Sequence, residues 1–212
     1  WQGVRLKAFD VPSGRKVHTR PIPRTGGLAI FASVILTNII FSFVYPEERF
    51  LFTTHPQWSI LAFGFYFIFA LGFFDDFKRL GPKVKFLGQI LAASMAFYAG
   101  VRIETIFGIN IQGVFFNLLS WAITVFWFLL IINAINLIDG LDGLAAGVVF
   151  ISAIVLVIVG ELHGYSFTVY KLIILAGVVL GFLRYNFNPA SIFMGDGGSY
   201  FLGYAIAALS IM

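Results

Sequence analysis

The sequence predicts an all-α protein that crosses a membrane several times. Of its 212 residues, 59% are hydrophobic and only 11% are charged, and the mean hydropathy is +0.93. The chain holds 26 Phe, eight Tyr and four Trp, which is more apolar surface than the core of a soluble protein of this length could cover. Lipid must therefore be the solvent for much of the chain, and a soluble globular fold is excluded.

Hydrophobic runs separated by polar clusters define the expected helices. A hydrocarbon core roughly 30 Å thick is crossed by about 20 helical residues. Seven runs approach that length, although the sixth is short and the seventh ends with the chain. They cover residues 26–45, 57–74, 84–101, 114–132, 144–160, 171–183 and 199–212. We therefore expect about seven transmembrane helices, with a small β-hairpin at 103–113, where apolar and polar residues alternate.

The placement of Lys and Arg predicts which side of the membrane each connection faces. Consecutive spans put alternate connections on one side, and eleven of the 14 Lys and Arg fall in or beside 1–25, 75–83, 133–143 and 184–198. The positive-inside rule assigns that side to the cytosol of a plasma (inner) membrane. Sidedness also accounts for the net charge of +4, so nucleic acid is not an expected partner.

The acidic residues gather at the same predicted side. Five of the ten fall in three clusters, each at the cytosolic end of a different hydrophobic run: Asp75 with Asp76, Asp139 with Asp142, and Asp196. Two adjacent carboxylates resist joint ionisation, so such a pair suits proton transfer or metal binding. The alternative is a pair of polar residues that merely ends a helix, although negative charge there opposes the helix dipole.

The second cluster carries a polar residue at every third position. These residues are Asn133, Asn136, Asp139 and Asp142. Neighbouring members share one face of a helix, and Gly140 and Gly143 are expected to break that helix and bring backbone close to a ligand. A polar seam between packed helices is the alternative.

The third cluster places Asp196 among three glycines at the start of the last run. Glycine lets phosphate oxygens approach both a metal ion and main-chain amides, so Asp196 suits a metal ligand. Capping of the helix by Asp196 or Ser199 is the alternative. The chain has no Cys, so its metal ligands are oxygen or imidazole, and carboxylates beside Lys and Arg favour Mg²⁺ or Mn²⁺ holding phosphates.

Two other kinds of protein place acidic residues in membrane helices. Ion-coupled transporters bind protons or Na⁺ on such carboxylates, but near the middle of the bilayer rather than at one side. Intramembrane Mg²⁺-dependent prenyltransferases also hold diphosphate with Asn and Asp, but with a different spacing. Both remain alternatives to an enzyme that joins a phosphate-containing substrate to a lipid.

Four motifs in order resemble those of the polyprenyl-phosphate N-acetylhexosamine-1-phosphate transferases. The first runs from Lys16 and His18 through Pro21 and Pro23 to Gly26 and Gly27, and the second joins Asp75 and Asp76 to Lys85, Phe86 and Gln89. The others are NAINLIDGLDGLAAG at 133–147 and FNPASIFMGDGGS at 187–199. This superfamily includes undecaprenyl-phosphate GlcNAc-1-phosphate transferases and phospho-MurNAc-pentapeptide translocases, and the chain looks closer to the GlcNAc branch.

The resemblance implies a UDP-activated N-acetylhexosamine as donor, polyprenyl phosphate as acceptor and Mg²⁺ (or Mn²⁺) as cofactor. UMP would be released and a lipid-linked diphosphate sugar formed, as in the synthesis of cell wall, teichoic acid and lipopolysaccharide. It also implies a basic cytosolic segment at 1–25 and a transmembrane catalytic domain at 26–212 whose active site faces the cytoplasm. The family does not fix the sugar, the lipid length, the base or whether the protein forms a homodimer.

Residue roles follow from the positions of the motifs. The implied catalytic residues are Asp75, Asp76 and Asp139, and the implied metal ligands are Asp196 and Asn136. The implied substrate-binding residues are Lys85 for phosphate, Phe193 for stacking on uracil, Asp142 for uridine, and Asn133 and Asn186. The family usually has a further helix before the first motif and a later loop rich in His or Arg. Neither is recognised here, so we expect the chain to be truncated and its domain to be incomplete at both ends.

Overall fold

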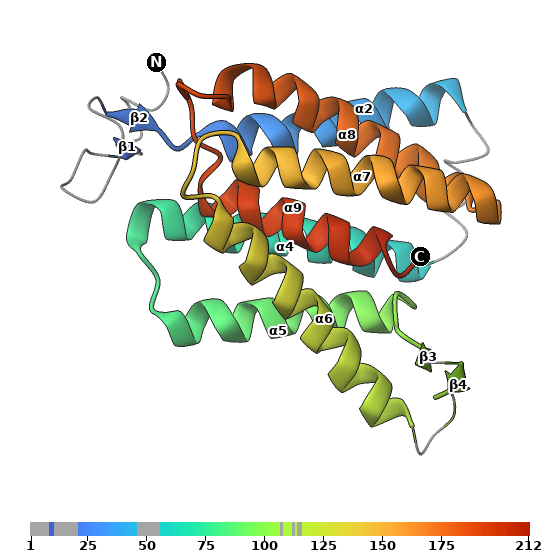
Figure 1. Cartoon of the computed structure of the whole chain (residues 1–212). Coiled ribbons are helices and arrows are strands. Elements are labelled where there is room, and N and C mark those ends of the chain that lie inside the picture. The colour runs from blue at the N-terminus through green and yellow to red at the C-terminus, as the bar shows by residue number, and fades with distance from the viewer. Residues whose placement is uncertain (1–8, 11–20, 46–55, 107, 112, 114–115) are drawn as a thin grey trace.

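The computed structural model describes residues 9–10, 21–45, 56–106, 108–111, 113 and 116–212, and it is dominated by helices (Figure 1). The helices are α2 (Gly26–Val44), α4 (Pro56–Lys78), α5 (Pro82–Tyr98), α6 (Asn117–Ile138), α7 (Leu144–His163), α8 (Ser166–Asn186) and α9 (Gly195–Leu209). Strands β1 (Phe9–Asp10) and β2 (Ile22–Pro23) form one antiparallel pair, and β3 (Thr105–Ile106) and β4 (Ile109–Asn110) form another. The second pair confirms the predicted hairpin.

Each predicted hydrophobic run overlaps one of these helices, but the helices differ in how well they suit a membrane. Five of those in the described part of the chain are long and apolar enough to cross a bilayer: α2, α4, α6, α7 and α8. Helix α5 has 17 residues and α9 has 15, which is short for a span of about 20 residues. An all-α, multi-pass membrane architecture is therefore confirmed, whereas the number seven stays a prediction.

Several helix boundaries differ from those that hydropathy alone predicts. Helix α6 ends at Ile138 rather than at 132, so Asn133 and Asn136 lie inside it. Helix α8 extends over Ser166–Asn186 rather than 171–183, because polar residues such as Lys171 and Arg184 lie inside the helix and shorten only the apolar run. Helix α4 continues to Lys78, so Asp75 and Asp76 lie within its last turn instead of following it.

Helix α9 is the centre of the bundle. Every residue from Gly197 to Leu209 is buried, and α9 packs against α4, α6, α2, α7 and α8. Small residues allow this close packing: a Cβ atom on Gly203 would lie 2.7 Å from Cα of Ile132 in α6. The core therefore forms around a short helix rich in Gly and Ala rather than around the most hydrophobic helices.

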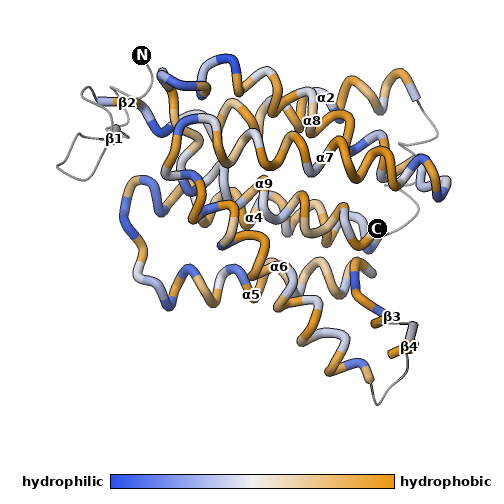
Figure 2. Tube along the Cα trace, viewed as in Figure 1, coloured by the Kyte–Doolittle hydropathy of each residue, from blue (hydrophilic) through white to orange (hydrophobic). Residues whose placement is uncertain are grey.

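The outer helices expose apolar side chains along their length. Helix α2 buries only Gly26, Gly27 and Ile30, while side chains such as Leu36 and Phe43 are exposed. Figure 2 shows hydrophobic residues along most of the length of the helices and hydrophilic residues mainly towards the ends of the bundle. This pattern is expected of helices whose outer surface contacts lipid.

The connections that carry the acidic clusters meet at one end of the bundle. In Figure 1 the α4–α5, α6–α7 and α8–α9 connections and the start of α2 all lie at the same end, and the β3–β4 hairpin lies at the other. Main-chain hydrogen bonds join two of these segments, because Gly26 N–H donates to the Phe193 carbonyl (2.9 Å) and Gly27 N–H donates to that of Met194 (2.8 Å).

Candidate active site

Asp196 and Asp75 share a single lysine. The Lys85 ammonium forms an ion pair with Asp75 and lies 3.3 Å from Oδ2 of Asp196. Asp75 is only 4% exposed, and its Oδ1 also accepts a hydrogen bond from Leu80 N–H (2.6 Å) in the turn that leads to α5. The turn between α4 and α5 thus brings a carboxylate and an ammonium from adjacent helices onto the first turn of α9.

Asp76 caps the N-terminus of α9 from the neighbouring helix. Its two carboxylate oxygens accept hydrogen bonds from the main-chain N–H groups of Asp196 (2.9 Å) and Gly197 (3.1 Å). A carboxylate in this position binds amides without helical partners and complements the positive end of the helix dipole. Gly195 has φ of +71°, and a Cβ atom there would lie 2.7 Å from the Asp76 carboxylate, so both the backbone conformation and the space favour glycine.

The expectation that Asp196 or Ser199 itself caps α9 is wrong. The helix starts at Gly195, and its first amides are bound by Asp76 instead. The Ser199 hydroxyl, which is fully buried, donates to the main-chain carbonyl of Asp196 (3.3 Å). The Asp196 carboxylate is therefore not used by its own helix and faces the groups from α5 and α6.

Asn136 approaches Asp196 from the other side, at the end of α6. Its Nδ2 donates to Oδ1 of Asp196 (3.2 Å) and to the Ser199 hydroxyl (2.9 Å). In this structure the amide nitrogen of Asn136, rather than its oxygen, faces the carboxylate. Asn136 thus orients Asp196, and the amide would have to rotate to offer its oxygen to a metal ion.

A second amide pair lies one helical turn deeper. Nδ2 of Asn133 donates to Oε1 of Gln89 (2.8 Å) and to the Leu129 carbonyl (2.7 Å), and Gln89 is only 1% exposed. Gln89 follows Lys85 by four residues and Asn133 precedes Asn136 by three, so the pair joins the faces of α5 and α6 that carry the site. The predicted substrate-binding residue Asn133 is therefore engaged within the protein.

Asp142 and Asn186 hold the loops on either side of the site. Oδ2 of Asp142 accepts hydrogen bonds from Ala190 N–H (2.9 Å) and from Nδ2 of Asn188 (3.2 Å). Asn186 is 2% exposed and bridges Gly143 N–H (3.2 Å) to the Ile192 carbonyl (2.9 Å). Gly143 has a φ of +71° and precedes α7, as expected for a residue that breaks the polar helix.

Asp139 is a partly exposed carboxylate of the second cluster. It follows the last residue of α6, and its carboxylate makes no hydrogen bond or ion pair with the residues that the structure describes. Asp139 keeps part of its surface exposed, yet burial by the surrounding groups raises its pKa well above the usual range; Arg24 opposes this shift, and the charges of Asp196 and Asp76 add to it. All three acidic clusters therefore act electrostatically on one another at the same end of the bundle.

Sequence reasoning missed three residues of this site. Gln89 stood in a motif without a role, Ser199 was considered only as a cap, and Arg24 was counted only as a basic residue. Arg24 lies close enough to act on the charges of both Asp76 and Asp139.

Phe193 is half-buried, and its N–H donates to the Pro23 carbonyl (2.9 Å). Lys16 and His18 of the first motif lie outside the described residues.

The carboxylates do not form a complete metal cage. Within the part of the chain that the structure describes, no three His, Asp or Glu side chains are grouped as ligands for one ion. Asp75 and Asp196 nevertheless converge on one cationic group, the Lys85 ammonium. Two hard oxygen ligands with room for others suit Mg²⁺, which commonly binds one or two carboxylates together with water and substrate phosphates.

Comparison with known protein families shows to which family the chain belongs. Residues 58–212 match the family described as Glycosyl transferase family 4. The chain belongs to this family. Every residue that the motifs assign to the site, from Asp75 to Asp196, falls within the part of the chain that matches glycosyl transferase family 4.

The chain is also similar to curated proteins that are named as transferases. The chain is 40% identical over 211 residues to the "Probable undecaprenyl-phosphate N-acetylglucosaminyl 1-phosphate transferase" of Bacillus subtilis, covering 99% of the chain and 56% of that protein. It is 39% identical to the "Decaprenyl-phosphate N-acetylglucosaminephosphotransferase" of Mycolicibacterium smegmatis, covering 98% and 53%. It is 38% identical to the "Phospho-N-acetylmuramoyl-pentapeptide-transferase" of Enterococcus hirae, covering 90% and 61%. The chain thus spans little more than half the length of these relatives.

Proposed function

We propose that the protein transfers a sugar-1-phosphate from a UDP-sugar to polyprenyl phosphate, releasing UMP and forming a lipid-linked diphosphate sugar. GlcNAc-1-phosphate is the favoured group, because the relatives at 40% and 39% identity are named for N-acetylglucosamine phosphate transfer. The convergence of Asp75, Lys85 and Asn136 on Asp196 carries the proposal. The carboxylates that could bind a metal ion lie beside the Lys85 ammonium at one end of an apolar bundle. A lipid phosphate in the membrane and a nucleotide in water could both reach this position.

Lys85 is the group that we assign to substrate phosphate. Its ammonium balances Asp75 and Asp196 in this structure, and phosphate oxygens would compete for the same hydrogen-bond donors. Lys85 would then hold negative charge that develops as the bond between the phosphates of the donor breaks. Asp75, the buried partner of Lys85, would hold that ammonium in place for the acceptor phosphate.

Asp196 and Asp75 would hold the metal ion, with the Asn136 oxygen as a further ligand after rotation of its amide. When bound, Mg²⁺ or Mn²⁺ would offset the charge of the substrate phosphates. Asp76 acts differently from its neighbour, because its carboxylate is used to fix the start of α9. We therefore treat Asp76 as a positioning residue and Asp139, at the end of α6, as a nearby charge that supports the site.

The two loops at this end would bind the nucleotide. Asp142 binds Asn188 and the Ala190 amide in the segment that leads to Phe193. This supports a nucleotide site in which the Phe193 ring stacks on uracil and Asp142 fixes the loop or binds uridine. Asn133 and Asn186 would contribute by holding helices and loops in place, since both use their amide groups within the protein.

The membrane arrangement extends the same proposal. All seven helices would cross or enter the bilayer as a domain over 26–212, preceded by a basic cytosolic segment at 1–25. The excess of Lys and Arg at the end that holds the acidic clusters supports an active site facing the cytoplasm of a plasma (inner) membrane. The product would enter cell-wall synthesis, and teichoic acid or lipopolysaccharide are the other destinations that this chemistry allows.

Asp196→Asn tests the proposed activity. We expect it to lower transfer of radiolabelled sugar phosphate from UDP-GlcNAc into extracted lipid at least about a hundredfold, because the variant keeps the shape of the side chain and loses the charge that holds the ion. The assay uses the complete protein in membranes containing polyprenyl phosphate, with UDP-GalNAc and UDP-MurNAc-pentapeptide as competing donors. EDTA should stop transfer, and Mg²⁺ should restore it.

The matched control is Glu161→Gln, which removes one negative charge near the end of α7 that lies away from the site. This variant should retain wild-type transfer. Wild-type activity in Asp196→Asn, with equal amounts of folded protein, would refute the proposed role of this residue.

A further inference from the structure

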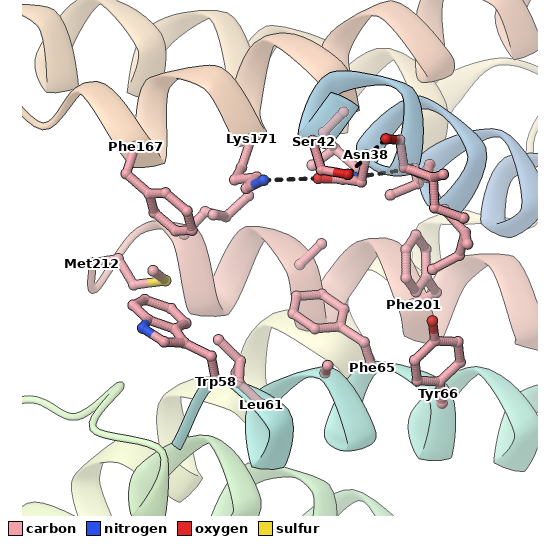
Figure 3. A pocket seen from close by; sticks show the side chains of 17 residues that line it. Asn38, Ser42, Trp58, Leu61, Phe65, Tyr66, Phe167, Lys171, Phe201 and Met212 are labelled. Atoms are coloured by element: carbon pink, nitrogen blue, oxygen red, sulfur yellow. Dashed lines mark hydrogen bonds between the residues drawn. The ribbon is translucent and has the colours of Figure 1, made fainter. Parts of the chain in front are cut away.

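A cavity of about 360 Å³ lies among α2, α4, α8 and α9, well away from the acidic cluster (Figure 3). Its walls are mostly apolar and include Trp58, Phe65, Phe201 and Met212. Trp58 and Asp76 are both in α4, about 18 residues apart, which is about 27 Å along a helix axis. The Trp58 side of the cavity therefore lies near the opposite end of the bundle from Asp75 and Asp196.

One wall of the cavity is polar and carries a cation that the proposed reaction does not use. Nζ of Lys171 donates to Oδ1 of Asn38 (2.9 Å), and it lies 4.9 Å from the centroid of the Phe167 ring and 5.5 Å from that of Phe41. Ser42 adds a hydroxyl to the same wall. Figure 3 shows Lys171, Asn38 and Ser42 facing one another across the upper side of the cavity.

The polar and apolar lining residues lie at different depths. Lys171 is five residues from the start of α8 and Trp58 is two from the start of α4, so both lie within about 8 Å of the helix ends, where Trp and Lys are typical of the membrane interface. Tyr66 and Phe201 lie further along α4 and α9, towards the middle of the bundle. The cavity is thus polar near the interface and apolar towards the centre, which matches the two parts of a lipid.

We propose that this cavity binds a membrane phospholipid with an anionic headgroup, with the phosphate at Lys171 and part of one acyl chain between Trp58 and Phe201. A phosphate near the ammonium gains more than one in water, because the aromatic and aliphatic walls lower the local dielectric. The acceptor of the proposed reaction is not the occupant, because its phosphate must reach Asp75 and Asp196 at the other end of the bundle. The bound lipid is therefore a second lipid that contacts the central helix α9 directly.

Native mass spectrometry of the detergent-solubilised protein tests the proposal. Phosphatidylglycerol and phosphatidylcholine with identical acyl chains are titrated separately, and the fraction of protein carrying one lipid is measured. We expect phosphatidylglycerol to bind about tenfold more tightly than phosphatidylcholine. Both lipids carry a phosphate, but the choline ammonium of phosphatidylcholine offsets its charge and would be repelled by Lys171. Lys171→Met should remove the preference, and Lys171→Arg should keep it.

Two further variants separate the cavity from general charge. Ala62→Phe places a ring in the cavity and should weaken the binding of both lipids. Arg102→Gln removes a positive charge on the same side of the bundle without lining the cavity, and it should leave the preference unchanged. Equal binding of the two lipids by the wild type, or an unchanged preference in folded Lys171→Met, would overturn the proposal. Displacement of phosphatidylglycerol by polyprenyl phosphate, with a higher KM for that acceptor in Lys171→Met, would also overturn it by assigning the cavity to the acceptor.

Discussion

Helices α9 and α2 begin side by side and then differ completely in their surroundings. Their first turns are in close contact, since a Cβ atom on Gly198 would lie 2.8 Å from Cα of Gly27. Beyond that contact α9 is buried to Leu209, whereas α2 buries no residue after Ile30. Both helices are apolar, so hydrophobicity does not distinguish a helix that faces protein from one that faces lipid. Small residues do, because they let neighbouring backbones approach.

Gly203→Leu, in the buried helix α9, should have the largest effect on the free energy of unfolding. Because glycine has no side chain, the α6 backbone at Ile132 can approach Gly203 closely, and a larger residue there must push α9 and α6 apart. We expect a loss of about 3 kcal/mol or more in the free energy of unfolding, or no folded protein. Thermal unfolding in one fixed detergent measures the change. Gly177→Leu in α8, where the added Cβ meets no atom within 4 Å, is the matched control and should cost less than about 1 kcal/mol.

Leu202→Ala and Leu36→Ala compare α9 and α2 with the same substitution. Leu202 is fully buried and Leu36 is 59% exposed. Truncation of Leu202 leaves a cavity and should cost about 2–4 kcal/mol, whereas the cost at Leu36 should remain below about 0.5 kcal/mol, because lipid fills the space. The same thermal assay applies. Equal costs at the two positions would mean that α2 is covered by protein rather than lipid.

Asp76→Ala tests how the start of α9 is held. It leaves the N–H groups of Asp196 and Gly197 without their carboxylate, so we expect a loss of about 1–2 kcal/mol in stability. Asp76→Asn keeps one acceptor oxygen and should lie between Asp76→Ala and the wild type. Hydrogen exchange of the α9 amides provides a local measurement. Unchanged protection in Asp76→Ala would show that the cap does not hold this helix.

Gln89→Leu should have the smallest measurable effect, about 1 kcal/mol, because it breaks one amide pair between α5 and α6, of which Gln89 is the buried member. Adding Asn133→Leu should recover part of this loss, since two apolar side chains can replace two amides at little cost. The four unfolding midpoints of the double-mutant cycle give the coupling. Strictly additive losses would argue against direct pairing of the two amides.

The sequence predicted the helices well, because each span must satisfy its own main-chain hydrogen bonds in lipid and so appears as a continuous apolar run. The runs missed the true ends of α4 and α8, where charged residues such as Asp75 and Arg184 continue the helix. The central position of α9 did not follow from hydropathy. Its glycines gave a signal, but one that was interpreted only as access for a ligand.

The sequence predicted which residues belong to the site, but not the role that each of them has. The position of Asp75, Asp76 and Asp196 at the same side of their hydrophobic runs indicated that they belong together, and the structure brings their segments to one end of the bundle. Which carboxylate faces Lys85 and which binds the α9 amides depends on how two helices cross, and no local pattern encodes that. For the same reason, sequence reasoning left Gln89 and Arg24 without roles.

Asp75 and Asp76 are consecutive, and this has a consequence for what the site can accept. Asp76 binds the first amides of α9, and Asp75 faces Lys85 of α5, which Asp196 also contacts. The Cα atoms of Asp75 and Asp76 are about 3.8 Å apart, so a single peptide unit links the contact with α9 to the contact with α5. The distance between these two contacts can therefore change little when a larger or smaller substrate binds.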